Sequence, residues 1–226
     1  LEFVGTIEVV DIGIPPAFIE EIPAATGLEM IYSTELRHLI PRRARGSHKG
    51  TYGHLLLIGG ARGYAGAIAL ACRAAARSGV GLTTALVPAS IAQVVASASL
   101  ETMVHPGPET EIGSLRADAL EPWWPRLGSF DAVLIGPGLT THPESAVLVR
   151  RLLERCPTPL VLDADALNVM AGEGAAIRGA RSSVVLTPHP GEIARLLQQD
   201  VARVQADRIG AAHAVAALTG AVTVLK

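Results

Sequence analysis

The chain has 226 residues, of which 49% are hydrophobic, and its formal net charge is −2. This length fits one large domain, or one domain with a fragment of another, and the hydrophobic content suffices for a sizeable core. Because the chain has no basic block and no apolar run of membrane-spanning length, we expect neither nucleic acid nor a membrane as its partner.

The first 50 residues have mixed composition. Residues 1–14 predict a strand stopped by two prolines, residues 15–33 a linker, and residues 34–39 a short helix. A basic patch follows at 42–50. It is either a solvated loop or a positively charged entrance that steers anions to a binding site. The chain also opens inside a strand-like run, so we expect it to be a piece of a longer protein.

From residue 55 onward, apolar strands alternate with helical segments. We predict strands at 55–58, 81–87, 101–104, 132–135, 160–162, 183–186 and 222–225. We predict helices at 67–77, 91–98 with Ser90 as cap, 114–127 with a break at Pro122, 143–155, from about 192, and 201–218 with Gly220 as stop. Strands without polar alternation, separated by helices, indicate an α/β fold with a mostly parallel sheet covered on both faces.

Four loops follow four of these strands, at 59–67, 136–140, 163–168 and 187–192. Strand-to-helix loops of a parallel sheet open at the same edge, where such folds bind ligands. We therefore expect the functional site at this edge.

The loop at 187–192 is the strongest candidate for ligand binding. Pro188 and Pro190 stiffen the backbone around His189, and Gly191 allows a close backbone approach. His189 either binds a ligand or only hydrogen-bonds a carbonyl group. Glu192 is explained equally well by the dipole of the following helix.

The other loops carry weaker signals. The glycine-rich turn matches neither a P-loop nor G-x-G-x-x-G, and Gly136-Pro137-Gly138 exposes backbone N–H groups. Asp163-x-Asp165 has three interpretations: a Mg²⁺ site, the nucleophile pair of a phosphatase, or a cap at Asp165 for the next helix. The histidines outside this loop show no metal-ligand spacing.

Cys72 and Cys156 are isolated, and each lies in a helix-like stretch. We interpret them as buried free thiols in a reducing compartment rather than as catalytic or metal-binding residues. Since the first residues also show no secretory signal, we expect a cytoplasmic protein.

Five motifs occur in an order typical of one family. They are His48-Lys49-Gly50-Thr51-Tyr52-Gly53-His54, the turn at 59–67, Ile135-Gly136-Pro137-Gly138-Leu139, Leu162-Asp163-Ala164-Asp165-Ala166-Leu167-Asn168 and Leu186-Thr187-Pro188-His189-Pro190-Gly191-Glu192. Over residues 34–226 the chain resembles the ADP/ATP-dependent NAD(P)H-hydrate dehydratases of the ribokinase-like superfamily. Residues 1–14 are similar to the end of the NAD(P)H-hydrate epimerase domain that precedes the dehydratase in bacterial bifunctional enzymes.

The resemblance implies a three-layer αβα ribokinase-like fold and a hydro-lyase that repairs nicotinamide cofactors. The S-form of hydrated NADH or NADPH is phosphorylated by ADP or ATP, and loss of phosphate regenerates the reduced cofactor. It further implies Mg²⁺, K⁺ for an epimerase half that converts the R-form, and a homo-oligomer.

The resemblance also implies the site residues. Those expected to contact the hydrated dinucleotide are Ala67, Gly138, His189, Pro190, Gly191, Glu192, Ile193, Ala194 and Arg195. Lys226 would begin the nucleotide-binding Lys-Gly segment. The family's Gly-Thr-Gly-Asp motif, which carries the general base, is absent from these 226 residues. We therefore expect the base and the rest of the domain beyond Lys226, and binding without turnover by the chain as given.

Two alternatives remain open at this stage. The chain could be a different ribokinase-like enzyme that phosphorylates a small alcohol such as a vitamin precursor. It could also be a catalytically incomplete dinucleotide-binding fragment.

Overall fold

The computed structural model describes residues 42–226 throughout and, before them, residues 8, 10, 12–15, 27–29, 31, 32, 36 and 39. The chain divides into two compact units, Leu1–Gly46 and Ser47–Lys226. The strand predicted at 1–14 and the helix predicted at 34–39 fall largely outside the described residues. Of the former, residues 8, 10 and 12–14 are described and do not belong to a strand. The domain boundaries after residues 14 and 33 stay predictions.

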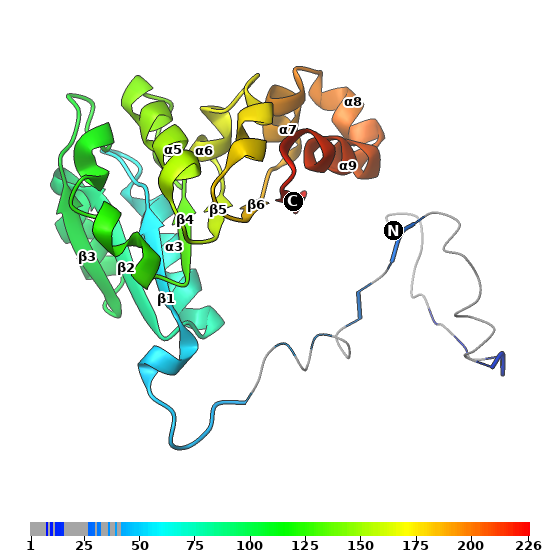
Figure 1. Cartoon of the computed structure of the whole chain (residues 1–226), viewed down its shortest axis with the longest axis horizontal. Coiled ribbons are helices and arrows are strands. Elements are labelled where there is room, and N and C mark those ends of the chain that lie inside the picture. Colours follow the sequence, from blue (N-terminus) through cyan, green and yellow to red (C-terminus); the bar gives the residue numbers. More distant parts are fainter. Residues whose placement is uncertain are drawn as a thin grey trace. The chain divides into compact units, whose positions relative to one another are not determined.

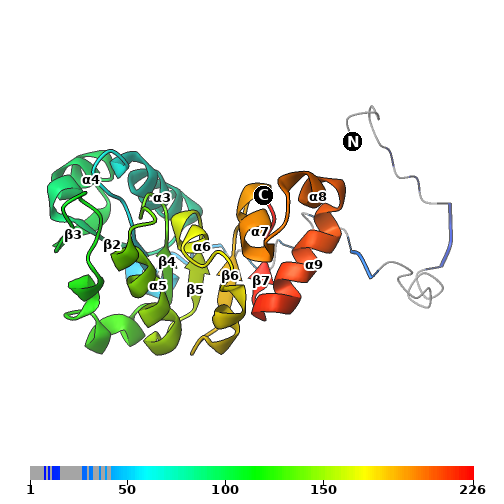
Figure 2. The same ribbon diagram turned by 90° about the horizontal axis from the view of Figure 1, so that it is seen from above.

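The unit Ser47–Lys226 is built on a seven-stranded sheet with the order β3-β2-β1-β4-β5-β6-β7, which Figures 1 and 2 show from two directions. All neighbouring strands are parallel. The strands are β1 (His54–Ile58), β2 (Leu82–Pro88), β3 (Thr102–Gly107), β4 (Ala132–Ile135), β5 (Leu160–Leu162), β6 (Val184–Leu186) and β7 (Val222–Thr223). The α/β class and the parallel sheet predicted from the sequence are confirmed.

Helices connect the strands. They are α3 (Ala65–Ser78), α4 (Ala92–Ala98), α5 (Pro143–Arg155), α6 (Asp165–Asn168), α7 (Pro190–Leu197), α8 (Val201–Ala206) and α9 (Arg208–Thr219). Short 3-10 helices are η2 (Lys49–Tyr52), η3 (Ala89–Ile91), η4 (Ala117–Leu120), η5 (Trp124–Ser129) and η6 (Gly174–Gly179).

Two hydrophobic cores lie on opposite faces of the sheet, because successive strand side chains point in opposite directions. Leu57 of β1 packs with α3 and α4 on one face. Its neighbours in sequence, Leu56 and Ile58, belong to the larger core on the other face, with residues from α5, α6, α7 and α9. The helical layers therefore form on both sides of β1.

The face that Leu57 occupies is less covered further along the sheet. In register with Leu57 follow Leu134, Val161, Val185 and Val222. The first three are half-buried, whereas Val222 is 64% exposed. Within the described residues, helices thus cover this face fully only near β1 and β2.

The sheet has a topological switch point between β1 and β4. From β1 the chain proceeds to β2 and β3 on one side, and then returns to add β4 to β7 on the other. Loops leaving neighbouring strands diverge at such a point, which is where open α/β sheets bind ligands.

Two predicted helices are wrong. Residues 114–127 form no single helix, since Ser114 and Leu115 make antiparallel bridges and η4 and η5 follow. The helix predicted at 201–218 is broken at Asp207, whose carboxylate accepts the N–H of Gly210 at 2.8 Å and begins α9. The physical reason in both cases is a polar group that satisfies backbone N–H groups outside a continuous helix.

Smaller predictions have mixed outcomes. Gly220 ends α9 in the left-handed conformation, as predicted. Ser90 does not cap α4, whose N-cap is Ile91, and β7 is shorter than predicted.

Cys72 and Cys156 are buried and free, and burial raises the pKa of both thiols. In the part of the chain that the structure describes, no helix is long and apolar enough to cross a bilayer.

Residues 47–50 of the basic patch belong to the same unit as the sheet and lie at the edge opposite to the predicted site. Next to Lys49, the N–H of Gly81 binds the carbonyl of Tyr52 at 2.9 Å, just before β2 begins. A Cβ atom at Gly81 would lie 1.7 Å from the carbonyl oxygen of Lys49. Residues 47–50 therefore lie at the amino ends of β1 and β2, away from the four predicted loops, and the steering hypothesis for the patch stays a prediction.

Candidate functional site at the carboxyl edge of the sheet

The four predicted loops meet at the carboxyl edge of the sheet. The N–H of Gly60 donates to the carbonyl of Pro137 at 2.8 Å, which joins the glycine-rich turn to the loop after β4. The hydroxyl of Thr187 donates to Asp163 Oδ1 at 2.8 Å and joins the loops after β5 and β6. The predicted convergence is confirmed.

Glycine is required at two positions of the loop after β4. Gly136 has a φ of 131°, and a Cβ atom there would lie 1.7 Å from the carbonyl oxygen of Asp163. Gly138 has a φ of 66°, and its Cβ atom would lie 3.2 Å from that of Ala67. Two predicted substrate residues, Gly138 and Ala67, are thereby neighbours; Gly138 is buried and Ala67 is exposed.

His189 is the N-cap of α7. Its Nδ1 accepts the N–H of Gly191 at 3.0 Å. The buried carboxylate of Glu192 accepts the N–H of His189 at 2.8 Å, and its other oxygen lies 3.2 Å from His189 Nε2. This reciprocal arrangement is a capping box, with histidine in the place usually taken by serine or threonine. The His189 side chain is 50% exposed. Its imidazole therefore has a structural role that the sequence did not reveal.

The backbone donors at the start of α7 are already occupied. Pro190 has no N–H, Gly191 donates to the His189 ring, and Glu192 and Ile193 both donate to the His189 carbonyl. An anion at this helix start would therefore be bound by side chains rather than by free backbone N–H groups.

The run from His189 to Arg195 presents few side chains to a ligand. Ile193 and Ala194 are buried in the large core, and Glu192 is 3% exposed. His189 and Arg195 are exposed, and both flank Gly191: a Cβ atom there would lie 2.8 Å from His189 Cε1 and 3.9 Å from Arg195 Nη1. A ligand could thus meet side chains of this run mainly through His189 and Arg195.

Asp163 is engaged by two donors. Its Oδ1 accepts from Thr187 and forms an ion pair with Lys226 Nζ at 2.6 Å. Lys226 is held in turn, because its N–H donates to the carbonyl of Pro188 at 2.9 Å and its carbonyl accepts from Arg208 at 2.8 Å. The predicted nucleotide residue therefore lies beside the predicted substrate loop.

Asp165 is not the cap of α6. The N-cap is Ala164, whose φ of 51° is rare for a residue other than glycine, and Asp165 is the first helical residue. Its two oxygens accept the N–H of Thr140 at 2.9 Å and the amide of Asn168 at 3.1 Å. The capping interpretation is wrong.

Asn168 continues this set of contacts, since its Oδ1 accepts from Arg195 Nη1 at 2.9 Å. We call Thr140, Asp165, Asn168 and Arg195 the Asp165 network. It connects the loop after β4 to α6 and α7. Sequence reasoning missed Thr140 and Asn168. The only signal was the Asp165-x-x-Asn168 spacing, which places both side chains on one helix face.

The Mg²⁺ interpretation of Asp163-x-Asp165 gains no support. Asp163 Oδ1 and both oxygens of Asp165 already accept hydrogen bonds. Among residues that the structure describes, no group of three or more His, Cys, Asp or Glu side chains could hold a metal ion.

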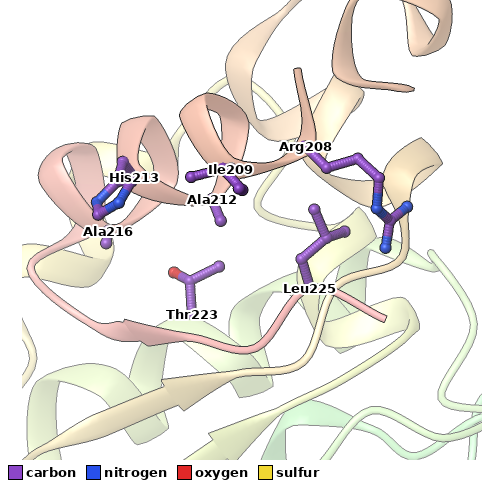
Figure 3. A pocket seen from close by; sticks show the side chains of 7 residues that line it. All are labelled: Arg208, Ile209, Ala212, His213, Ala216, Thr223 and Leu225. Atoms are coloured by element: carbon purple, nitrogen blue, oxygen red, sulfur yellow. The ribbon is translucent and has the colours of Figure 1, made fainter. Parts of the chain in front are cut away.

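A pocket of about 470 Å³ lies between α9 and the end of β7 (Figure 3). Its lining residues are Arg208, Ile209, Ala212, His213, Ala216, Thr223 and Leu225. None of the predicted substrate residues lines it, so it is distinct from the loop site.

The fold is a ribokinase-like α/β domain in which the loops after four strands meet at the carboxyl edge of a parallel sheet. The NAD(P)H-hydrate dehydratase family model matches residues 55–226. The chain belongs to this family, as the sequence motifs predicted.

Individual relatives agree with this assignment. The bifunctional NAD(P)H-hydrate repair enzyme of Moorella thermoacetica is 42% identical over 222 residues, which are 98% of this chain and 42% of the relative. The ADP-dependent (S)-NAD(P)H-hydrate dehydratase of Neisseria meningitidis is 37% identical over 84% of this chain and 60% of its own length. The chain thus spans only part of each relative.

A solved structure gives the same result. The ADP/ATP-dependent NAD(P)H-hydrate dehydratase of Bacillus subtilis, co-crystallised with ATP and Mg²⁺, superposes with a TM-score of 0.68 and 28% identity. The similarity covers 89% of this chain and 68% of that one. A ribokinase-like protein of Enterococcus faecalis superposes with a TM-score of 0.64 and 25% identity, over 83% of this chain and 62% of its own.

Proposed function

We propose that this chain is the dehydratase part of a nicotinamide-cofactor repair enzyme. It binds the S-form of hydrated NADH or NADPH and, with ADP or ATP, takes part in restoring the reduced cofactor. The observation that carries the proposal is the meeting of Ala67, Gly138 and His189 with Lys226 at one edge of the sheet. The family match and the Neisseria relative's name support the same activity.

The reaction has two steps. The hydroxyl oxygen on the hydrated nicotinamide ring attacks the terminal phosphorus of ADP or ATP, and the bond to the leaving AMP or ADP breaks. The hydroxyl proton goes to a general base. The new phosphate ester then leaves as inorganic phosphate, while the ring loses a proton and regains its double bond.

The residues contribute mainly to binding. Ala67 is exposed and lies against the buried Gly138, and His189 and Arg195 offer exposed side chains to polar groups. Lys226 is the cation on the nucleotide side. We assign no general base, because Asp163 and Asp165 are both engaged by donors of the protein.

The accompanying components belong to the same proposal. ATP and Mg²⁺ were co-crystallised with the Bacillus relative. Since Mg²⁺ is commonly held by one or two carboxylates together with substrate phosphates, we assign the ion to the nucleotide and derive no step from a metal site on the described residues. K⁺ for an epimerase half and a homo-oligomer stay predictions of the family resemblance, and a cytoplasmic location stays a prediction of the sequence.

Calorimetric titration tests the proposal. We expect the chain to bind S-form hydrated NADH at least about tenfold more tightly than NADH, a difference of about 1.4 kcal/mol. Recovery of NADH absorbance after adding Mg²⁺ with ADP or ATP measures turnover and identifies the donor. Binding and phosphorylation of a hydroxymethylpyrimidine or thiazole alcohol, with no affinity for hydrated NADH, would instead identify a small-alcohol kinase.

A further inference from the structure

Arg195 is held by a neutral oxygen, as are Arg178 and Arg208 in the described chain. Arg195 Nη1 donates to the neutral amide oxygen of Asn168 at 2.9 Å. Four other arginines each have a carboxylate oxygen within 3.2 Å: Arg62, Arg116, Arg150 and Arg151. A carboxylate orients an arginine and also compensates its charge, whereas an amide oxygen orients it without compensating the charge.

The amide of Asn168 has a fixed orientation. Its Nδ2 donates to Asp165 Oδ1 at 3.1 Å, so its oxygen is turned towards Arg195. Asp165 is itself fixed by the N–H of Thr140 at 2.9 Å. The negative charge of Asp165 is therefore separated from the guanidinium group by one neutral side chain.

The location of Arg195 suits the binding of a phosphate group. The guanidinium lies beside Gly191 and His189, at a helix start whose own N–H groups are occupied. An oriented guanidinium with four free N–H donors matches the oxygen geometry of a phosphate group. Both hydrated NADH and hydrated NADPH carry a diphosphate.

We propose that Asp165 and Asn168 are positioning residues that orient Arg195 and keep its charge available for a phosphate group of the dinucleotide. The inference rests on the proposed function for the identity of the ligand. It adds a role for two residues that touch no ligand themselves, and it names the chemical group that Arg195 binds.

The decisive variant is the double exchange Asp165→Asn with Asn168→Asp. It keeps the net charge and can form the same hydrogen bonds. The new amide accepts from Thr140 and donates to the new carboxylate, which in turn accepts from Arg195. It differs in one respect: a carboxylate now lies against the guanidinium and compensates its charge. A purely structural network would tolerate the exchange.

Affinities for S-form hydrated NADH, NADH and inorganic pyrophosphate are measured by calorimetry at several salt concentrations. Arg195→Gln should weaken binding of hydrated NADH and pyrophosphate about ten- to a hundredfold, the range for hydrogen bonds to charged groups. The double exchange should cost about tenfold and reduce the salt dependence, because one charge fewer faces the ligand. Asn168→Ala should cost about three- to tenfold, since it releases the side chain and keeps the charge.

Arg150→Gln is the matched control. Arg150 on α5 pairs with Glu173 and loses the same charge on substitution, away from the loop site. It should leave all affinities within twofold. Urea unfolding is measured for every variant, and the double exchange should unfold at nearly the wild-type concentration.

The outcomes separate the two proposals. Wild-type affinity and salt dependence in the double exchange would overturn the inference, as would failure of the wild-type chain to bind either phosphate-bearing probe. If Arg195→Gln and the double exchange weaken pyrophosphate binding as expected while hydrated NADH shows no advantage over NADH, the inference stands and the proposed function fails.

Discussion

The two edges of the sheet are built from different kinds of contact. At the amino edge, most of these contacts involve backbone groups: Gly81 lies against the Lys49 carbonyl, the Asp131 N–H donates to the His54 carbonyl at 2.9 Å, and the His54 N–H donates to the Asp131 carboxylate at 2.7 Å. At the carboxyl edge, charged side chains hold the loops, and Thr140 and Ala164 have φ angles of 67° and 51°. Uncommon backbone conformations concentrate where function requires a fixed geometry. Under the proposed function, the amino edge serves stability and the carboxyl edge serves ligand binding.

The largest test of this comparison uses one glycine from each edge. In both Gly136→Ala and Gly81→Ala the new Cβ atom would lie 1.7 Å from a backbone oxygen. We expect each variant to lose about 3 kcal/mol or more of unfolding free energy in urea titrations. Under conditions where both are folded, only Gly136→Ala should also weaken hydrated NADH binding. Equal affinities of the two variants would show that the edges do not differ in function.

A smaller effect is expected at the cap of α7. His189→Ala removes the acceptor of the Gly191 N–H, so we expect it to lose about 1 kcal/mol of stability. His189→Asn is the control, because asparagine is also a good N-cap and should keep the stability. If both variants bind hydrated NADH less tightly, the imidazole contacts the ligand; wild-type binding by His189→Asn would leave it only the capping role.

The smallest effect concerns pH at the amino edge. Burial lowers the pKa of His54 below its usual 6.5, with Asp131 opposing and Arg126 adding to the shift. The unfolded chain then binds the proton more readily than the folded one. The stability from neutral His54 is therefore fully present above pH 6.5 and falls as the pH drops from there towards the lowered folded pKa.

Urea unfolding between pH 5 and 8 measures this effect. His54→Gln should flatten the curve in this range. A wild-type curve with no slope below pH 6.5 would contradict the prediction.

Much of the fold could be predicted because its signals are local. The strands β4 and β5 and the helix α5 have the predicted bounds, since each is an apolar or amphipathic run between strong turn residues. The region 114–127 could not be predicted in this way. The N–H of Ala117 donates to the carboxylate of Glu144, a partner far away in sequence that competes with helix formation.

The same limit applies to the site. The four loops could be placed at one edge because parallel topology requires it. The Asp165 network could not, since Asp165 meets Thr140 and Asn168 meets Arg195 only after three loops have folded together. The capping role of His189 was hidden for another reason: histidine is not among the residues favoured at an N-cap.

The switch point also bears on how the molecule folds. Residue 55 of β1 pairs with residue 132 of β4, and the whole of β2, β3 and their helices lies between them. Joining such distant segments loses the conformational entropy of a long loop before the stabilising contacts between the strands have formed. This entropy loss slows folding. The two flanks of the sheet can each assemble from closer segments. We therefore expect the junction of β1 and β4 to form late and to limit the folding rate.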